Sequence, residues 1–346
     1  MSGKAIGTAL IGFGLAGEVF HAPLIQSTKG LALRAVVSSR KDAIAAAGLR
    51  PAASFEQMLE DPEIALVVIA TPNATHHALA RAALEAGKHV VVDKPLGVSA
   101  RKARDLAAFA AARGLALSPF HNRRWDGDFL TVRKLLAEAR LGEVMLFEAC
   151  WDRHRPRVAS HWKEEAAQGG GIVNDLAPHM IDQALLLFGR PETLSAELLR
   201  QREGACVDDY FDIRLHYGAR IVRLSGSMLA AAPRPRFQLH GAGGSFVKSG
   251  LDPQQGQLKD GLRPGRAGYG AEPRAQYGLL TLPGGAGARL RTERGRWQDY
   301  YRQMARAVAG SGPVPVDPKD AVLGLEIIEA ARLAANRGRT VELAAG

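Results

Sequence analysis

The stretch AIGTALIGFGLAG, residues 5 to 17, decides the fold of the N-terminal part of this chain. Ala5 to Ile11 is a short apolar run of the kind that forms a buried strand. Glycines follow at Gly12, Gly14 and Gly17. In this spacing the first glycine permits a tight turn, the second lets the backbone approach a pyrophosphate, and the third lets the next helix pack closely on the strand. The start of that helix offers free N–H groups to an anion. We therefore predict a Rossmann dinucleotide-binding unit with cofactor contacts from Gly12, Phe13, Gly14, Leu15 and Ala16.

The residues after the second strand bear on which nucleotide is bound. That strand is predicted over Leu31 to Val37, and the residues that follow it are Ser38, Ser39, Arg40 and Lys41. An acid at this point would accept hydrogen bonds from the ribose 2′-hydroxyl of NAD, but none occurs before Asp42. Hydroxyls and a guanidinium suit a 2′-phosphate, because arginine presents a bidentate fork to phosphate oxygens. We expect NADP(H) to be preferred, with NAD possible. The alternative is that Arg40 and Lys41 only open an exposed helix.

Two further strands are predicted to end at the same edge of the sheet. One covers Leu66 to Ala70 and is followed by Thr71, Pro72 and Asn73, with His76 opening the next helix. The other lies in HVVVDKPLG, residues 89 to 97, and ends in Asp93, Lys94 and Pro95. Ligands of open α/β sheets collect at the carboxyl ends of parallel strands. We therefore expect Lys94 to point its ammonium at a ligand, although an arbitrary lysine after a strand is more often only solvated.

Length and composition set the broad class. A chain of 346 residues exceeds the usual size of one hydrophobic core, so we expect two domains, 1–120 and 121–346. Its 47% apolar and 23% charged residues are ordinary for a globular protein. Two distant cysteines argue against a disulfide framework, and the N-terminus lacks a signal-peptide pattern, so a cytoplasmic location is expected. The net charge of +10 is scattered, which disfavours nucleic acid as a partner, and no apolar run is long enough to span a bilayer.

The second half of the chain has a different pattern. A helix is predicted over 128–138, a strand over 143–151 and a helix over 174–188, and several short candidate strands follow between 194 and 248. This succession is typical of an open, mainly antiparallel sheet. Residues 251–276 are rich in glycine, proline and charge and are predicted to form a long surface loop that could cover the site. Helices are predicted over 295–308 and 317–337.

A second group of chemically active residues lies on the helix of 174–188. Asp175, His179 and Asp182 are spaced four and three residues apart, so they share one face. Taken alone, Asp175 could be a helix cap, His179 a core histidine and Asp182 a solvated acid. Beside a dinucleotide site they suggest hydride-transfer chemistry. Histidine is the side-chain type whose unperturbed pKa lies near neutrality, so His179 suits proton exchange with an alcohol, and Lys94 would stabilise charge on the substrate oxygen.

Four motifs together resemble the Gfo/Idh/MocA family of NAD(P)-dependent oxidoreductases. They are the glycine motif of residues 12–17, TPNATHH (71–77), EAGKHVVVDKPLG (85–97) and GGGIVNDLAPHMID (169–182). The runs HNRRWDGDF (121–129) and KSGLDPQQGQLKDGLRPG (248–265) resemble a bacterial branch that includes NADP-dependent scyllo-inositol dehydrogenase. One departure is Asp93, where the family has Glu before Lys-Pro.

The resemblance implies a catalytic set of Lys94, Asp175 and His179, with Asp182 as helix-end or supporting residue and His76 beside the cofactor. It also implies a homodimer or homotetramer paired through the C-terminal sheet. No metal is needed, because the nicotinamide takes the hydride. A cyclic polyol, inositol or sugar is the expected substrate. Polar and aromatic residues that could contact it are Asn122, Arg123, Trp125, Arg153 and Trp162, although both tryptophans could instead be core.

Two other functions remain open from the sequence. One is a redox-neutral enzyme that retains NAD(P) and oxidises its sugar substrate only transiently. The other is a non-catalytic dinucleotide-binding regulator, which the presence of Lys94 and His179 disfavours.

Overall fold

The predicted N-terminal strands pair into one parallel sheet in the computed structural model, which describes residues 5–285 and 287–343. The spatial order is β2 (Leu31–Val37), β1 (Ile6–Ile11), β3 (Leu66–Ile69), β4 (His89–Val92) and β5 (Leu117–Pro119), with every neighbouring pair parallel. All four residues of β3 are fully buried, which explains their continuous apolar run. The Rossmann prediction is confirmed. The signal-peptide prediction depends partly on residues 1–4, and these lie outside the described residues.

Helices connect these strands much as the sequence predicts. Ser54 caps α3 and Ser99 caps α5, each accepting a hydrogen bond from the backbone three residues on. The helix after the glycine motif begins as a π-helical segment, η1, before α1 continues it. The helical elements of this region are η1 (Ala16–His21), α1 (Ala22–Gln26), α2 (Lys41–Ala46), α3 (Phe55–Glu60), η2 (Asn73–Thr75), α4 (His76–Glu85), α5 (Ala100–Ala112) and η3 (Asn122–Trp125).

The chain divides into two units, and the first is discontinuous in sequence. It comprises residues 1–125, 254–269 and 296–322, whereas the second comprises 126–253, 270–295 and 323–346. The later segments supply α8 (Gln254–Lys259) and α9 (Gln298–Val308) to the first unit, while α10 (Pro318–Arg337) has residues in both. The predicted division into 1–120 and 121–346 places these later segments in the second domain, whereas the structure groups them with the first unit.

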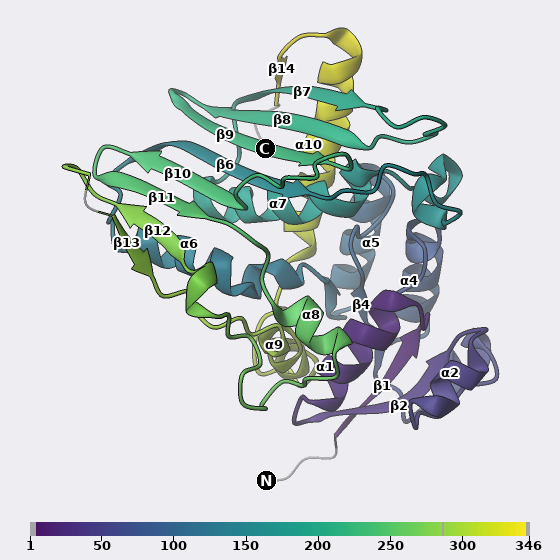
Figure 1. The fold of residues 1–346 in the computed structure, drawn as a ribbon. Coiled ribbons are helices and arrows are strands. Elements are labelled where there is room, and N and C mark those ends of the chain that lie inside the picture. The colour runs from purple at the N-terminus through teal and green to yellow at the C-terminus, as the bar shows by residue number, and fades with distance from the viewer. Residues whose placement is uncertain (1–4, 286, 344–346) are drawn as a thin grey trace. The chain divides into compact units, whose positions relative to one another are not determined.

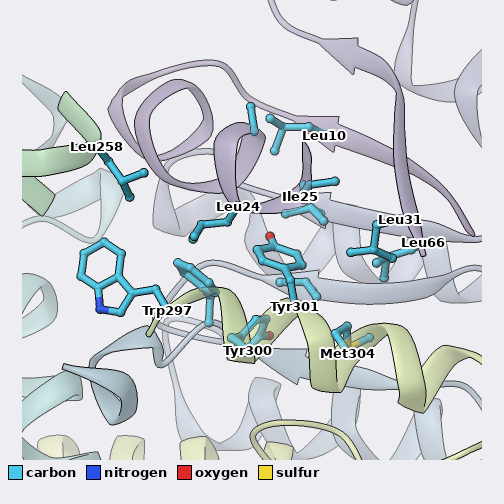
Figure 2. Packing of buried hydrophobic residues seen from close by; sticks show 14 of the residues in the cluster. Leu10, Leu24, Ile25, Leu31, Leu66, Leu258, Trp297, Tyr300, Tyr301 and Met304 are labelled. Carbon is cyan, nitrogen blue, oxygen red and sulfur yellow. The ribbon is translucent and has the colours of Figure 1, made fainter. Parts of the chain in front are cut away.

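The hydrophobic core of the first unit explains why those segments belong to it. Figure 2 shows Trp297, Tyr300, Tyr301 and Met304, at and along α9, gathered with Leu24 and Ile25 of α1 and with Leu258 of α8. All of these side chains are buried. Such contacts remove large aromatic surfaces from water, at roughly 25 cal/mol per Å² of apolar area.

The second unit is built on a mixed sheet of nine strands (Figure 1). Its neighbours pair antiparallel except β6 and β9, which are parallel. Helix α7 (Ile172–Phe188) packs on β8 and β9. The strands in spatial order are β13 (Gly287–Leu290), β12 (Gly278–Thr281), β11 (Gly244–Lys248), β10 (Phe237–Gly241), β6 (Val144–Asp152), β9 (Arg220–Ser227), β8 (Tyr210–Tyr217), β7 (Thr193–Leu199) and β14 (Val341–Glu342). The other helical elements are α6 (Gly127–Ala137), η4 (Trp162–Glu164), η5 (Ala166–Gln168) and η6 (Arg274–Gln276). The predicted open, mainly antiparallel sheet is confirmed.

One expectation about the fold is wrong. Residues 251–276 are not a plain surface loop, because they contain α8 and bury Gln254, Leu258 and Tyr269. The Gln254 side chain accepts from the Trp297 backbone N–H at 2.7 Å and donates to the Trp125 carbonyl at 3.1 Å. The segment is therefore anchored by its polar and apolar side chains, which its glycine-rich and proline-rich composition obscures. Within residues 5–285 and 287–343, no helix has the length and apolar character needed to cross a membrane.

Candidate active site

The glycine motif has the shape that a pyrophosphate requires. Gly12 has φ +94° and a side chain there would collide with the Ala70 carbonyl, while one at Gly17 would collide with the Gly12 carbonyl. By contrast, a side chain at Gly14 would project into open space. The first and third glycines are thus fixed by packing and the second leaves room for a ligand, which fits the residues to a dinucleotide. We call these residues, with Arg40, the 71–76 turn and Asp93-Lys94, the nucleotide cluster.

Arg40 ties the loop after β2 to the glycine motif. Its Nη1 donates to the Phe13 carbonyl at 2.6 Å and to the Glu18 carboxylate at 2.8 Å. Ser38 Oγ accepts from the Arg40 backbone N–H at 3.3 Å, and Lys41 is the first residue of α2. A helix therefore opens here, as the alternative expects, and the Arg40 guanidinium contacts the glycine motif. The preference for a 2′-phosphate stays a prediction.

His76 connects the turns that follow β3 and β4. Its Nδ1 lies 2.8 Å from the Pro95 carbonyl oxygen and its Nε2 lies 2.9 Å from the Thr71 carbonyl oxygen. Burial lowers the pKa of His76, whereas these two carbonyls work against the shift. The ring therefore fixes the positions of two strand ends that line the predicted crevice.

Lys94 is the second residue after β4, close to the predicted strand end, and its backbone N–H donates to the Asp93 carboxylate at 2.8 Å. Burial alone would raise the pKa of Asp93, but His21, Lys94 and His76 outweigh it and lower that pKa below its ordinary value. The carboxylate beside Lys94 is therefore held in its ionised form.

In the second unit, the N-terminus of α7 is fixed by a residue far from it in sequence. Asp208 accepts from the Val173 backbone N–H at 2.7 Å, and its carbonyl accepts from Ile172 at 2.9 Å. Gly171 has φ +99°, and a side chain there would lie 2.6 Å from the Asp208 carboxylate. Burial raises the pKa of Asp208. The glycine run before α7 thus lets an acid approach and cap the helix.

Asp175, in the first turn of α7, is bound by two cations. Arg153 Nη1 donates to one carboxylate oxygen at 3.0 Å, and Lys163 Nζ donates to the other at 2.7 Å. Asp175 is mostly buried, whereas Lys163 is partly exposed. The arrangement pairs both carboxylate oxygens of Asp175 with cations and presents hydrogen-bond donors and an acceptor together.

His179 lies one turn further along α7 and is buried. Its ring stacks on Trp151 of β6, with centroids 6.0 Å apart and planes at 29°. Asp182 is also buried in the interior of this helix, so it is not a helix-end residue. We call Arg153, Lys163, Asp175, His179 and Trp151 the α7 cluster.

The residues predicted to contact substrate fall into two groups. Asn122, Arg123 and Trp125 form η3 in the first unit, where Arg123 donates to Gln255 at 2.6 Å and lies over the Trp297 ring. Trp125 packs edge-on against Tyr300. Arg153 and Trp162 belong to the second unit, and Trp162 directly precedes Lys163.

Comparison with known proteins accounts for the presence of a glycine-motif unit and the α7 cluster in one chain. The profile of the NAD-binding Rossmann fold of an oxidoreductase family matches residues 6–121, and the profile of that family's C-terminal alpha/beta domain matches 133–343. The chain belongs to the Gfo/Idh/MocA family. It is an oxidoreductase with an NAD-binding domain.

Relatives within the Gfo/Idh/MocA family match along nearly the whole chain. The oxidoreductase YdgJ of Escherichia coli K12 is 45% identical over 338 residues, covering 94% of both chains. The scyllo-inositol 2-dehydrogenase (NADP(+)) IolW of Bacillus subtilis is 35% identical over 343 residues, covering 98% of this chain and 96% of IolW. Among solved structures, the YPO2259 oxidoreductase of Yersinia pestis is 42% identical with a TM-score of 0.94, covering 99% of this chain and 98% of that one.

Sequence reasoning missed three contributors to this Gfo/Idh/MocA site. Lys163 contacts Asp175, Asp208 caps α7, and Trp151 stacks on His179. Only Lys163 had a signal, since it follows a tryptophan already singled out. Trp151 lies on β6 and Asp208 in the loop before β8, so both reach α7 through the fold, which spacing along the chain does not reveal.

Proposed function

We propose that this Gfo/Idh/MocA oxidoreductase transfers hydride between NADP(H) and a secondary alcohol or ketone of a cyclic polyol, inositol or sugar. The observation that carries the proposal is the α7 cluster, in which an imidazole and a doubly paired carboxylate share one helix. IolW, whose name records an NADP-linked inositol reaction, supports the same substrate class.

The preference for NADP(H) is supported by Arg40. Its guanidinium contacts the glycine motif directly, and no acid stands between Val37 and Asp42 to bind a ribose 2′-hydroxyl. Arginine pairs well with a phosphate because its planar fork matches two oxygens.

The proposed chemistry divides between hydride and proton. Bound nicotinamide supplies the hydride acceptor or donor. His179 takes the hydroxyl proton during oxidation and returns it during reduction, which suits a side chain that titrates near neutrality. The Lys94 ammonium stabilises negative charge that develops on the substrate oxygen. Asp175, Arg153 and Lys163 bind neighbouring hydroxyl groups, because together they offer an acceptor and several donors.

The nucleotide preference is tested without a substrate. Calorimetry compares binding of adenosine 2′,5′-bisphosphate and 5′-AMP, two probes that differ by the 2′-phosphate. We expect the bisphosphate to bind at least about tenfold more tightly, a difference of about 1.4 kcal/mol. Equal binding contradicts the NADP assignment.

The substrate class is tested with a panel of inositols, aldoses and ketoses, followed at the nicotinamide absorbance with both cofactors. Turnover of inositols or sugars with stoichiometric absorbance change supports the proposal. Product formation without net absorbance change, by protein that retains its cofactor through gel filtration, identifies the redox-neutral alternative. Nucleotide binding without any conversion identifies a regulator.

The homo-oligomer remains a prediction from the family resemblance. We propose that copies pair through the nine-stranded sheet of the second unit. Light scattering coupled to gel filtration measures the mass, and a mass of 37.0 kDa, that of one chain, contradicts the prediction.

A further inference from the structure

A row of buried polar side chains runs from α9 to the end of β4 within the first unit. Tyr301 OH lies 2.6 Å from His21 Nδ1, although the two residues are far apart in sequence. Both side chains are fully buried. Figure 2 shows Tyr301 directed away from α9 towards the N-terminal elements of the core. Nothing in the dinucleotide fingerprint or the proposed chemistry requires this pair.

The other side of the His21 ring faces the carboxylate next to Lys94. His21 Nε2 lies 3.9 Å from Asp93 Oδ2, and Asp93 Oδ1 accepts from the Lys94 backbone N–H at 2.8 Å. Phe120 packs over the imidazole with ring centroids 4.3 Å apart, which fixes the plane of the ring. The row therefore ends at the turn that carries Lys94.

The proton positions along the row follow from charge. Asp93 is ionised and only accepts, so the favourable tautomer of His21 carries its proton on Nε2, towards the carboxylate. Nδ1 is then an acceptor for the Tyr301 hydroxyl, whose pKa burial raises, so that it keeps its proton. The Tyr301 hydroxyl then donates to His21 Nδ1, and His21 Nε2 faces the Asp93 carboxylate across a 3.9 Å contact. Beside the row itself, Tyr300 lies near Tyr301, and His76 and Lys94 lie near Asp93.

We propose that Tyr301 and His21 are positioning residues that orient the Asp93 carboxylate, and through it the backbone and charge of Lys94. The inference rests on the proposed function only in giving Lys94 a part in the reaction. The two residues touch neither substrate nor cofactor in this proposal. Their effect reaches the reaction solely through Asp93.

The chain offers a matched pair of variants. Tyr301→Phe removes the hydroxyl that contacts His21, and Tyr300→Phe removes the neighbouring hydroxyl, which donates to the Ser118 carbonyl at 3.1 Å. Both tyrosines are fully buried on the same helix, so both variants lose one buried hydrogen bond. Thermal denaturation is expected to show similar losses. Only Tyr301→Phe is expected to alter Lys94.

The first readout needs no substrate. Acylation of Lys94 by acetic anhydride at fixed pH, mapped by mass spectrometry, reports how much of the amine is uncharged. Asp93→Asn removes a charge that favours the ammonium, so labelling is expected to rise several-fold. Tyr301→Phe is expected to shift labelling in the same direction and Tyr300→Phe to leave it unchanged. Labelling that is identical in both tyrosine variants overturns the proposal.

The second readout is a double-mutant cycle on oxidation of scyllo-inositol by NADP⁺. Tyr301→Phe is expected to lower kcat by about tenfold with little change in KM for NADP⁺, because small misplacements at a reacting centre are costly. In an Asp93→Asn background the same change is expected to cost less than about twofold, since the row no longer acts on a carboxylate. Equal losses in both backgrounds overturn the proposal.

Two controls keep the outcomes separate. If Tyr301→Phe does not melt cooperatively, His21→Asn breaks the row at its centre and is expected to show the same non-additive pattern. Full activity of Lys94→Ala, or no turnover of any inositol, aldose or ketose of the panel by the parent enzyme, counts against the proposed function, while the labelling comparison still decides whether the row acts on Lys94.

Discussion

At the scale of single residues, the proposed mechanism assigns the proton transfer to His179 and the stabilisation of charge on the substrate oxygen to Lys94. Lys94→Ala and His179→Ala should each lower kcat by on the order of 100-fold. Both should leave binding of 5′-AMP intact, because neither contacts the glycine motif in the proposal. The measurement is steady-state turnover beside calorimetric binding. Near-normal turnover of either variant would remove that residue from the mechanism.

The proposed nucleotide selectivity also rests on one residue, Arg40. Arg40→Asp should abolish the preference for adenosine 2′,5′-bisphosphate over 5′-AMP, since the new carboxylate repels the 2′-phosphate. Lys41→Asp makes the same charge change one residue later and serves as the control. We expect it to retain most of the preference, measured by calorimetry. A preference unaffected by Arg40→Asp contradicts the role given to the guanidinium contact with Phe13.

Residues next to a chemical motif in sequence could be predicted, whereas residues that reach it through the fold could not. Lys94 follows the end of β4, and His76 is the first residue of α4. The sequence marks both of these element boundaries clearly. His21 lies in an apolar helical stretch, and its partner Tyr301 is 280 positions away. No local pattern signals such a pair, because the contact is made by packing α9 into the core of the first unit.

At the scale of elements, the two ends of α7 give a matched comparison. Gly189 at its C-terminus has φ +74°, and a methyl group added there would meet open space, so Gly189→Ala should cost only backbone strain of about 1–2 kcal/mol. Gly171→Ala adds a collision with the capping Asp208 and should cost about 1 kcal/mol more. Urea unfolding of both variants measures the difference. Equal losses would mean that Asp208 moves aside without consequence.

The end of β6 carries a pH-dependent contribution to stability. Burial alone would raise the pKa of Asp152, but hydrogen bonds from Arg234 at 2.7 and 2.9 Å outweigh it and lower the pKa below its ordinary value of 3.8. The stabilisation is therefore present above that value and disappears as pH falls through the lower, folded pKa. Asp152→Asn should cost about 2 kcal/mol at neutral pH, less than a fully buried pair because Arg234 is partly exposed.

The pH dependence is checked by denaturant unfolding of Asp152→Asn and the parent protein between neutral pH and roughly pH 3, where the difference should shrink. Asp105→Asn is the control, since Asp105 forms exposed ion pairs with Arg81 at 3.4 Å and His77 at 3.3 Å. We expect little loss from that variant. A difference for Asp152→Asn that grows on acidification would reverse the sign and refute the argument.

Elements with strong periodicity or caps were predictable, and elements without them were not. The apolar runs of β3 and β4 and the serine caps of α3 and α5 follow directly from the sequence. Strands β12, β13 and β14 are only two to four residues long, and β13 is mostly exposed, so they carry little periodic signal in the sequence. Helix α8 forms in a polar stretch because Leu258 and Gln254 are held by the core around Trp297.

At the scale of the whole molecule, the first unit depends on segments encoded late in the chain. A fragment of residues 1–125 would lack Trp297, Tyr300 and Tyr301, leaving their apolar contacts in the core exposed. We expect this fragment to bind the dye ANS and to unfold without a cooperative transition, monitored by circular dichroism. The full chain is the comparison. A fragment that melts cooperatively and binds 5′-AMP would show that the late segments are dispensable.

The interrupted first unit also has a consequence for biosynthesis. A ribosome working from the N-terminus releases the five parallel strands early, but the aromatic residues that seal their core arrive only with α9. Until α9 is synthesised, the incomplete core of this sheet leaves apolar surface exposed to other proteins in the cell. The growing polypeptide should therefore need shielding by chaperones for most of its translation, and slowing codons placed after residue 125 would prolong that hazard without relieving it.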